Sequence, residues 1–98
     1  MISDTDRDEK ALVLREQGRP FGGIAEMLAL ESAGAANASF NRALRLRPKA
    51  EQLRLRNREM ARLDALASRL RGREDLSVEE IVRRLRGVKY QRKTLNVG

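Results

Sequence analysis

The sequence predicts an all-α fold in which a three-helix domain is followed by a long helix and a short C-terminal helix. Three observations lead to this prediction. Apolar residues recur at helical spacing, residues that cap or end helices stand at the segment boundaries, and no segment alternates as a strand does. A length of 98 residues suits one small domain with an appended helix or tail.

The composition excludes several classes of protein. The chain has no cysteine and no histidine, which excludes a Cys/His zinc site, a disulfide scaffold and the common nucleophile–histidine mechanisms. No acidic residues stand at metal-ligand spacing, and no glycine-rich loop follows a strand. We therefore expect a protein that is not an enzyme and needs no cofactor.

The first helix is predicted over residues 6–17. Its acidic start suits the helix dipole, and Ser3 is one of several candidate caps. Ala11 and Leu14, with Leu12 beside them, supply an apolar face. Gly18 fits the left-handed position that ends many helices.

The second helix is predicted over residues 20–28. Pro20 fits its first turn, where a missing N–H costs nothing. Ile24, Ala25 and Leu28 form its apolar stripe. A short connector then leads to Ser32.

The third helix is predicted from the cap Ser32 to about Leu46, and Pro48 ends it. Ala36, Phe40 and Ala43 follow the i, i+4, i+7 pattern of a core face. The other side is predicted to carry Ala33, Gly34, Asn37, Ala38, Asn41, Arg42 and Arg45.

A long amphipathic helix is predicted over residues 49–71, within a segment that covers 48–72. Its apolar residues recur at heptad spacing, interrupted by Arg56. The residues of this stripe are Leu53, Met60, Leu63, Ala67 and Leu70. The stripe predicts that this helix braces the domain or pairs two copies as a homodimer.

The last segment, 73–98, is predicted to hold a short helix and a basic tail. Ser77 followed by Glu80 is the pattern of a capping box, which starts a helix that ends at Arg86, before Gly87. We expect the tail to touch a DNA backbone. Residues 74–98 are alternatively expected to bind a protein partner.

The charge is distributed unevenly along the chain. Residues 1–31 carry a balance of −3, residues 32–73 of +8 and residues 74–98 of +2, which makes a net charge of +7. A localised basic field of this kind usually marks a polyanionic partner. The alternative is a solvated, arginine-rich helical surface.

The second and third helices have the arrangement of a homeodomain-like helix-turn-helix, in a domain over residues 1–47. Their connector is short, and Ala25 is small where the two helices cross. The third helix would then lie in the major groove, where small side chains permit close approach and asparagine pairs best with adenine. The residues predicted to contact DNA are Ser32, Ala33, Gly34, Asn37, Ala38, Asn41, Arg42, Arg45, Arg47 and Lys49.

The run KALVLREQGRPFGGIAEMLALESAGAANASFNRAL, residues 10–44, resembles the helix-turn-helix segment of small actinobacterial and actinophage DNA-binding proteins. The following helix is similar around residues 61–66, so the resemblance covers roughly 10–70. It implies a DNA-binding regulator or a terminase-small-subunit-like component of phage DNA packaging. Ala29 departs from the pattern, since glycine is usual there, and Gly22-Gly23 replaces polar residues.

Together these features predict a sequence-preferring double-stranded DNA-binding protein, with transcriptional regulation as the leading role. The alternatives are a phage or prophage packaging subunit, a non-specific nucleoid-associated protein and a protein–protein adaptor. No apolar run reaches the length of a membrane span, and the first ten residues do not have the composition of a signal peptide. We therefore expect a cytoplasmic, nucleoid-associated protein with no membrane contact.

Overall fold

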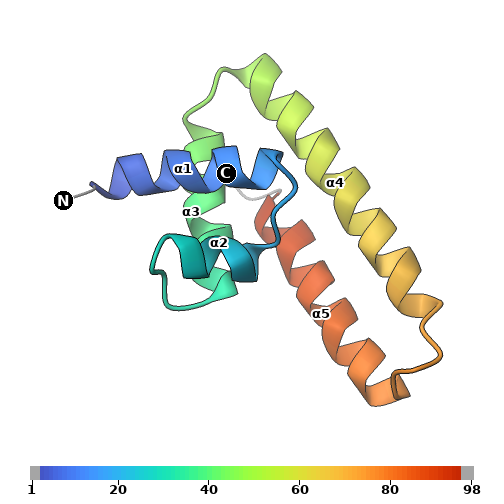
Figure 1. Ribbon diagram of the computed structural model, residues 1–98. Coiled ribbons are helices and arrows are strands. Elements are labelled where there is room, and N and C mark those ends of the chain that lie inside the picture. The colour runs from blue at the N-terminus through green and yellow to red at the C-terminus, as the bar shows by residue number, and fades with distance from the viewer. Residues whose placement is uncertain (1–2, 96–98) are drawn as a thin grey trace. The chain divides into compact units, whose positions relative to one another are not determined.

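The computed structural model describes residues 3–95, which form five helices and no strand. The helices are α1 (Asp4–Glu16), α2 (Phe21–Met27), α3 (Ala33–Arg45), α4 (Lys49–Arg71) and α5 (Val78–Leu95) (Figure 1). The all-α prediction is therefore confirmed. The chain divides into two units, residues 1–52 and 53–98, so most of the two predicted segments after residue 47 falls into one unit.

Helix α1 begins and ends as the sequence predicts, within two residues. The Ser3 hydroxyl accepts a hydrogen bond from the Asp6 amide at 3.2 Å, which caps the first turn. At the other end Gly18 has a φ of 88°, and the Arg19 amide donates to the Leu14 carbonyl at 3.2 Å. This is the left-handed, glycine-based ending that satisfies the last carbonyls of a helix.

Helix α2 ends in the same way, but with alanine in the left-handed position. Ala29 has a φ of 54°, and the Leu30 amide donates to the Ala25 carbonyl at 2.8 Å. The turn therefore does require a positive φ, which glycine adopts without strain and alanine does not. At the start of this helix Pro20 is the residue before the first turn, not within it, since its ψ of 152° is extended.

The Ala29→Gly variant is expected to raise the free energy of unfolding by about 1 kcal/mol, because it removes left-handed strain at a helix end. The gain is partly offset by the larger conformational freedom of glycine in the unfolded chain. A urea titration followed by circular dichroism measures it. The matched control is Gly18→Ala, which puts the same strain into the end of α1. Loss of stability in both variants would contradict the explanation.

The core of the first unit forms where α3 packs against α1 and α2. Ser32 caps α3 through a bond from the Ala35 amide at 3.1 Å. The predicted core residues Ala36, Phe40 and Ala43 are all buried. The Phe40 ring meets Phe21 edge-on, with 5.7 Å between ring centroids.

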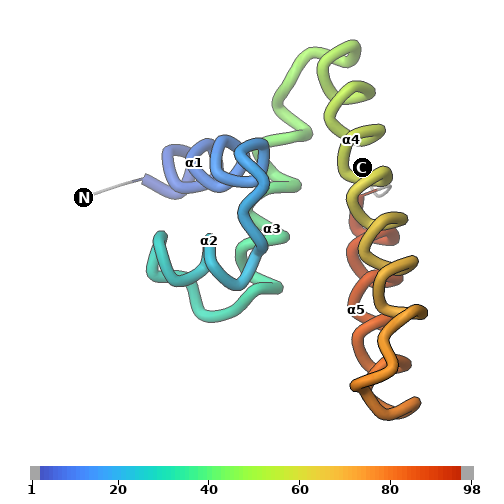
Figure 2. Tube along the Cα trace, turned by 45° about the vertical axis from the view of Figure 1, so that its right-hand side comes forward, coloured from blue at the N-terminus to red at the C-terminus, as the bar shows by residue number. Residues whose placement is uncertain are grey.

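Helices α4 and α5 run antiparallel, side by side, in the second unit (Figures 1 and 2). Leu63, Ala67 and Leu70 of α4 pack with Val88 of α5 in one apolar cluster. At the open end of this hairpin the Arg56 side chain donates to the Leu95 carbonyl at 3.3 Å.

The apolar stripe of α4 is therefore occupied within the chain. Leu63, Ala67 and Leu70 are buried in the hairpin, whereas Leu53, predicted to begin the stripe, is 61% exposed. Leu55 is buried in its place. The buried stripe of α4 therefore starts two residues later than the heptad pattern indicates. Leu53 is the large apolar side chain of α4 that stays exposed, and the homodimer through this helix remains a prediction.

Helix α5 extends nine residues beyond its predicted end at Arg86. The Ser77 hydroxyl accepts from the Glu80 amide at 3.1 Å, so the predicted start is confirmed. The prediction that Gly87 ends the helix is wrong, and the tail is helical as far as Leu95. Burial of Val88 and Leu95 outweighs the cost of one glycine within the helix, which is about 1 kcal/mol.

The Gly87→Ala variant is expected to raise the free energy of unfolding by about 1 kcal/mol, because alanine has the higher helix propensity. A Cβ atom built at Gly87 meets nothing within 4 Å, so no clash opposes this gain. Urea unfolding measures the change, and amide hydrogen exchange in residues 88–95 should slow with it. A neutral or destabilising result would show that α5 does not continue through Gly87.

Candidate nucleic-acid interface

The start of α3 presents an exposed face without bulky side chains. Ser32, Ala33, Gly34 and Ala38 are all exposed. A Cβ built at Gly34 would contact only the Ser32 hydroxyl, at 3.6 Å, so open space surrounds it. The backbone at this end of α3 can therefore approach a flat or grooved partner closely. The Ser32 hydroxyl itself already accepts the capping bond.

The two asparagines do not lie on this face, contrary to the prediction. Asn37 and Asn41 are 5% and 4% exposed, and the Asn41 amide donates to the Asn37 side-chain oxygen at 3.4 Å. The reason is their helical position. They share an i, i+4, i+7 stripe with Leu44, which is buried beside the core residues of α3. Side chains in this position do not present their amides to base edges.

Arg42 is exposed but has a carboxylate partner that sequence analysis missed. Its guanidinium donates to Asp8 twice, through Nε to Oδ2 at 2.9 Å and through Nη2 to Oδ1 at 3.0 Å. The Ser39 hydroxyl, which is fully buried, donates to the same Oδ1 at 2.5 Å. These bonds join α1 to α3. The signal in the sequence was Ser39, a polar residue on the core face of α3 that needs a buried partner.

The pKa of Asp8 reflects this clamp. Burial raises the pKa of its carboxyl group, but the hydrogen bonds from Arg42 and Ser39 and the positive charge of Arg42 outweigh that effect. The net result is a pKa below the ordinary value. The hydrogen bond to Asp8 in turn raises the pKa of Arg42. Because Asp8 partly neutralises it, Arg42 adds less positive charge to the protein surface than an unpaired arginine would.

The remaining predicted cations lie at the end of α3 or just after it. Arg47 is half-buried and forms ion pairs with Glu9 of α1 and with Glu51, the latter at 3.5 Å. Arg45 and Lys49 are exposed. Gln52 fixes the connection to α4, since its side-chain amide donates to the carbonyls of Arg45 and Arg47 at 3.2 and 2.7 Å.

Eight of the ten predicted contact residues are thus at least partly exposed, and the two buried ones are the asparagines. The face that remains is small and neutral at the start of α3 and basic after it. Charge is nevertheless balanced over the first unit, because residues 1–52 carry eight basic and eight acidic side chains. Residues 53–98 carry thirteen basic and six acidic side chains, so the whole net charge of +7 belongs to the second unit.

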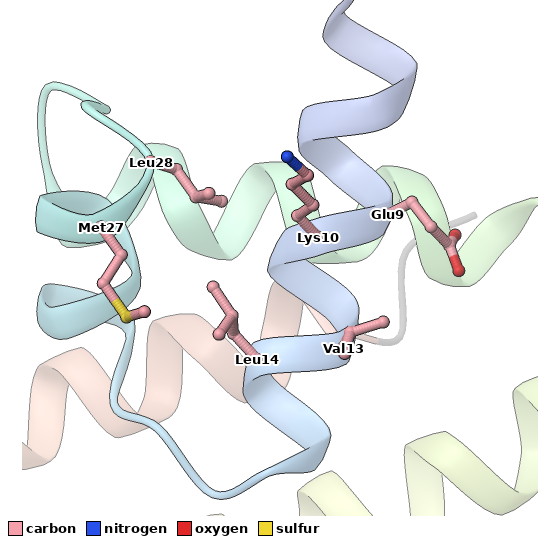
Figure 3. Close-up of a pocket in the computed structure, with 6 residues that line it drawn as sticks. All are labelled: Glu9, Lys10, Val13, Leu14, Met27 and Leu28. Carbon is pink, nitrogen blue, oxygen red and sulfur yellow. The ribbon is translucent and has the colours of Figure 1, made fainter. Parts of the chain in front are cut away.

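A hollow of about 330 Å³ lies between α1 and the end of α2 in the first unit. Figure 3 shows Leu14 of α1 facing Met27, the last residue of α2, and Leu28, which follows it, with Lys10 above. The lining of the hollow is mostly apolar, with Glu9 and Lys10 as the charged residues.

Other kinds of site find no support in the part of the chain that the structure describes. No three metal-binding side chains gather anywhere in residues 3–95. Across the same range, no helix combines the length and the hydropathy needed to span a bilayer. Comparison of the chain with protein-family models, with curated proteins and with solved structures finds no match. The resemblance to actinobacterial and actinophage proteins therefore stays a prediction.

Proposed function

We propose that the chain is a non-enzymatic double-stranded DNA-binding protein and that α3 lies in the major groove as the second helix of a helix-turn-helix. The observation that carries this proposal is the exposed face of α3. Its first two turns bear only Ser32, Ala33, Gly34 and Ala38, and cations follow at its end. A helix can enter a major groove deeply when no bulky side chain separates its backbone from the base edges.

The turn before α3 gives the proposal a second support. Helix α2 ends with the left-handed Ala29, and α3 starts at Ala33 after the Ser32 cap. The free amides at the start of α3 and its dipole favour an approaching phosphate. Arg45 and Lys49 are the exposed cations best placed along the chain to contact the backbone beside the groove.

Transcriptional regulation is the role we propose first, with DNA packaging as the alternative that uses the same chemistry. Burial of Asn37 and Asn41 favours a second candidate, a nucleoid-associated protein without base specificity. With the asparagines buried, the exposed polar side chains of α3 and its cap are those of Ser32, Arg42 and Arg45. A protein of this second kind would depend on phosphate contacts and would show a steep salt dependence with no preferred site.

The deciding experiment is selection from a random duplex library. The full chain is incubated with the library at about 0.15 M salt, where surface charges are strongly screened, with excess non-specific competitor. Enrichment of a shared motif supports the regulator or packaging role. Retention without enrichment supports the nucleoid-associated candidate. No retention overturns DNA binding and favours the adaptor, which would bind through residues 74–98.

A further inference from the structure

Helix α5 carries six cations, and the structure divides them into two groups. Arg83 and Arg84 are ion-paired with Glu80, at 3.1 and 2.9 Å, and Arg92 with Asp64 of α4. The other three cations have no hydrogen-bond or ion-pair partner within residues 3–95 and are exposed. These are Arg86, Lys89 and Lys93.

The three unpaired cations share one face of the helix with the only tyrosine of the chain. Arg86, Lys89, Tyr90 and Lys93 occupy positions i, i+3, i+4 and i+7, which lie on the same side of a helix. Tyr90 is 58% exposed, although a phenol ring of its size gains by burial. No acidic residue occurs between residues 81 and 95. We call this set of four residues the α5 cationic face.

We propose that the α5 cationic face binds the phosphate backbone of double-stranded DNA, as a second contact surface separate from α3. From Arg86 to Lys93 the face extends about 10 Å, given a rise of 1.5 Å per residue. One DNA strand advances 3.4 Å along the axis per nucleotide, so this length covers about three phosphates. The Tyr90 hydroxyl adds a donor of the kind that contacts phosphate oxygens.

The charge balance of the two units supports this assignment. The first unit has no net charge, so the long-range attraction of the chain to a polyanion comes mainly from residues 53–98, which carry the +7. In this division of roles α3 would contact the groove and α5 would supply affinity that is independent of sequence. The inference rests on the proposed function, because it names a further surface for the same partner.

An anionic membrane offers similar phosphate chemistry, but the helix fits it less well. A helix that lies on a bilayer inserts an apolar face beside its basic one. In α5 Leu85 packs against the cluster shared with α4, and Val88 and Leu95 are buried. This leaves Val78 and Val82, beside Arg83 and Arg86, as the exposed large aliphatic side chains of the helix, too few for an apolar face that could insert. DNA therefore accounts for the face better than a lipid surface does.

The test compares two double variants of the full chain with the same change of net charge. Arg86→Gln/Lys93→Gln removes two unpaired cations from the face, and Arg83→Gln/Arg84→Gln removes two that are ion-paired with Glu80. Binding to a labelled 20-base-pair duplex of random sequence is measured by anisotropy at several salt concentrations. Circular dichroism checks that both variants keep the helix content of the wild type.

The face variant is expected to lower the slope of log affinity against log salt by about 2, since each lost phosphate contact removes about 0.9. Its affinity at low salt should fall by at least about tenfold, while the paired-cation variant keeps the wild-type slope. Tyr90 emission gives an independent readout, because the chain has one tyrosine and no tryptophan. Duplex should quench this emission in the wild type but less in the face variant at equal saturation.

Three other outcomes overturn the proposal, and they differ in what they leave standing. If the face variant binds with the wild-type slope and Tyr90 emission is insensitive to duplex, the α5 cationic face is no DNA contact and the proposed function survives. If the wild-type chain does not bind duplex at all, both proposals fail. If Tyr90 emission responds to vesicles containing phosphatidylserine but not to duplex, the face binds lipid.

Discussion

Replacing Asp8 with alanine is expected to lower the free energy of unfolding by about 2 kcal/mol. The carboxylate accepts three hydrogen bonds that join α1 to α3, from Ser39 and from Arg42. Its loss leaves the buried Ser39 hydroxyl without this acceptor, and this unsatisfied donor accounts for most of the cost. Arg42 adds less, because its side chain is 54% exposed and can turn to water.

Urea unfolding of matched variants measures this effect. The control is Asp75→Ala, which removes an exposed carboxylate paired with Arg73 at 2.6 Å and should change stability much less. The double variant Asp8→Ala/Ser39→Ala should lose less free energy of unfolding than the two single variants lose together, because no donor is then left unsatisfied. Strict additivity, or equal effects at Asp8 and Asp75, would show that the clamp does not hold the helices together.

The same clamp sets a pH dependence with a definite sign. The pKa of Asp8 is lower in the folded protein than its ordinary value, so its contribution to stability is present above the unfolded pKa, near 3.9. The contribution is lost as the pH falls through the folded value. The stability difference between wild type and Asp8→Ala should therefore be constant above about pH 5 and shrink in more acidic solution.

Enlarging the side chain at residue 38 is expected to lower duplex affinity by at least about tenfold. Ala38 lies in the exposed small-residue face of α3, one turn after Gly34. The Ala38→Gln variant adds bulk without charge, and Ala38→Glu adds bulk and a charge that phosphates repel. Glutamine and glutamate are both good helix formers, so α3 should stay folded in either variant. Anisotropy with a labelled duplex measures the loss.

Two controls separate bulk from charge at this position. Ala38→Ser keeps the face small and should bind within about twofold of the wild type, since it adds one atom at an exposed site. Thr5→Glu makes the same charge change as Ala38→Glu at an exposed position of α1 and should have little effect. Wild-type affinity in Ala38→Gln would show that α3 does not approach DNA through this face.

Local sequence signals determined the helices and most of their ends. Caps such as Ser3, Ser32 and Ser77 act within three residues, as the bonds to Asp6, Ala35 and Glu80 show. The inward side of α3 followed from helical periodicity in the same way, because the periodicity places Ala36, Phe40 and Ala43 on one stripe. These features depend on neighbours along the chain, so the sequence alone can predict them.

Tertiary structure decided which polar groups remain available for a partner. Asp8 meets Ser39 and Arg42 across 31 and 34 residues, and no local pattern predicts such a pair. Asn37 and Asn41 stand at the border of the core stripe of α3, where periodicity does not distinguish a buried side chain from an exposed one. Their burial removes the base contacts that the sequence predicted, since an amide that is covered cannot pair with a base.

The length of α5 is a further case in which packing outweighed a local signal. By itself Gly87 favours an end of the helix, at a cost of about 1 kcal/mol if the helix continues. The helix nevertheless continues past Gly87, because the burial of Val88 and Leu95 outweighs that cost. The sequence by itself determined where helices begin to within two residues. The tertiary structure decided how far α5 runs and that Lys89, Tyr90 and Lys93 line up with Arg86. The physical reason is range, since caps and periodicity act between neighbours, whereas burial depends on residues far apart in the chain.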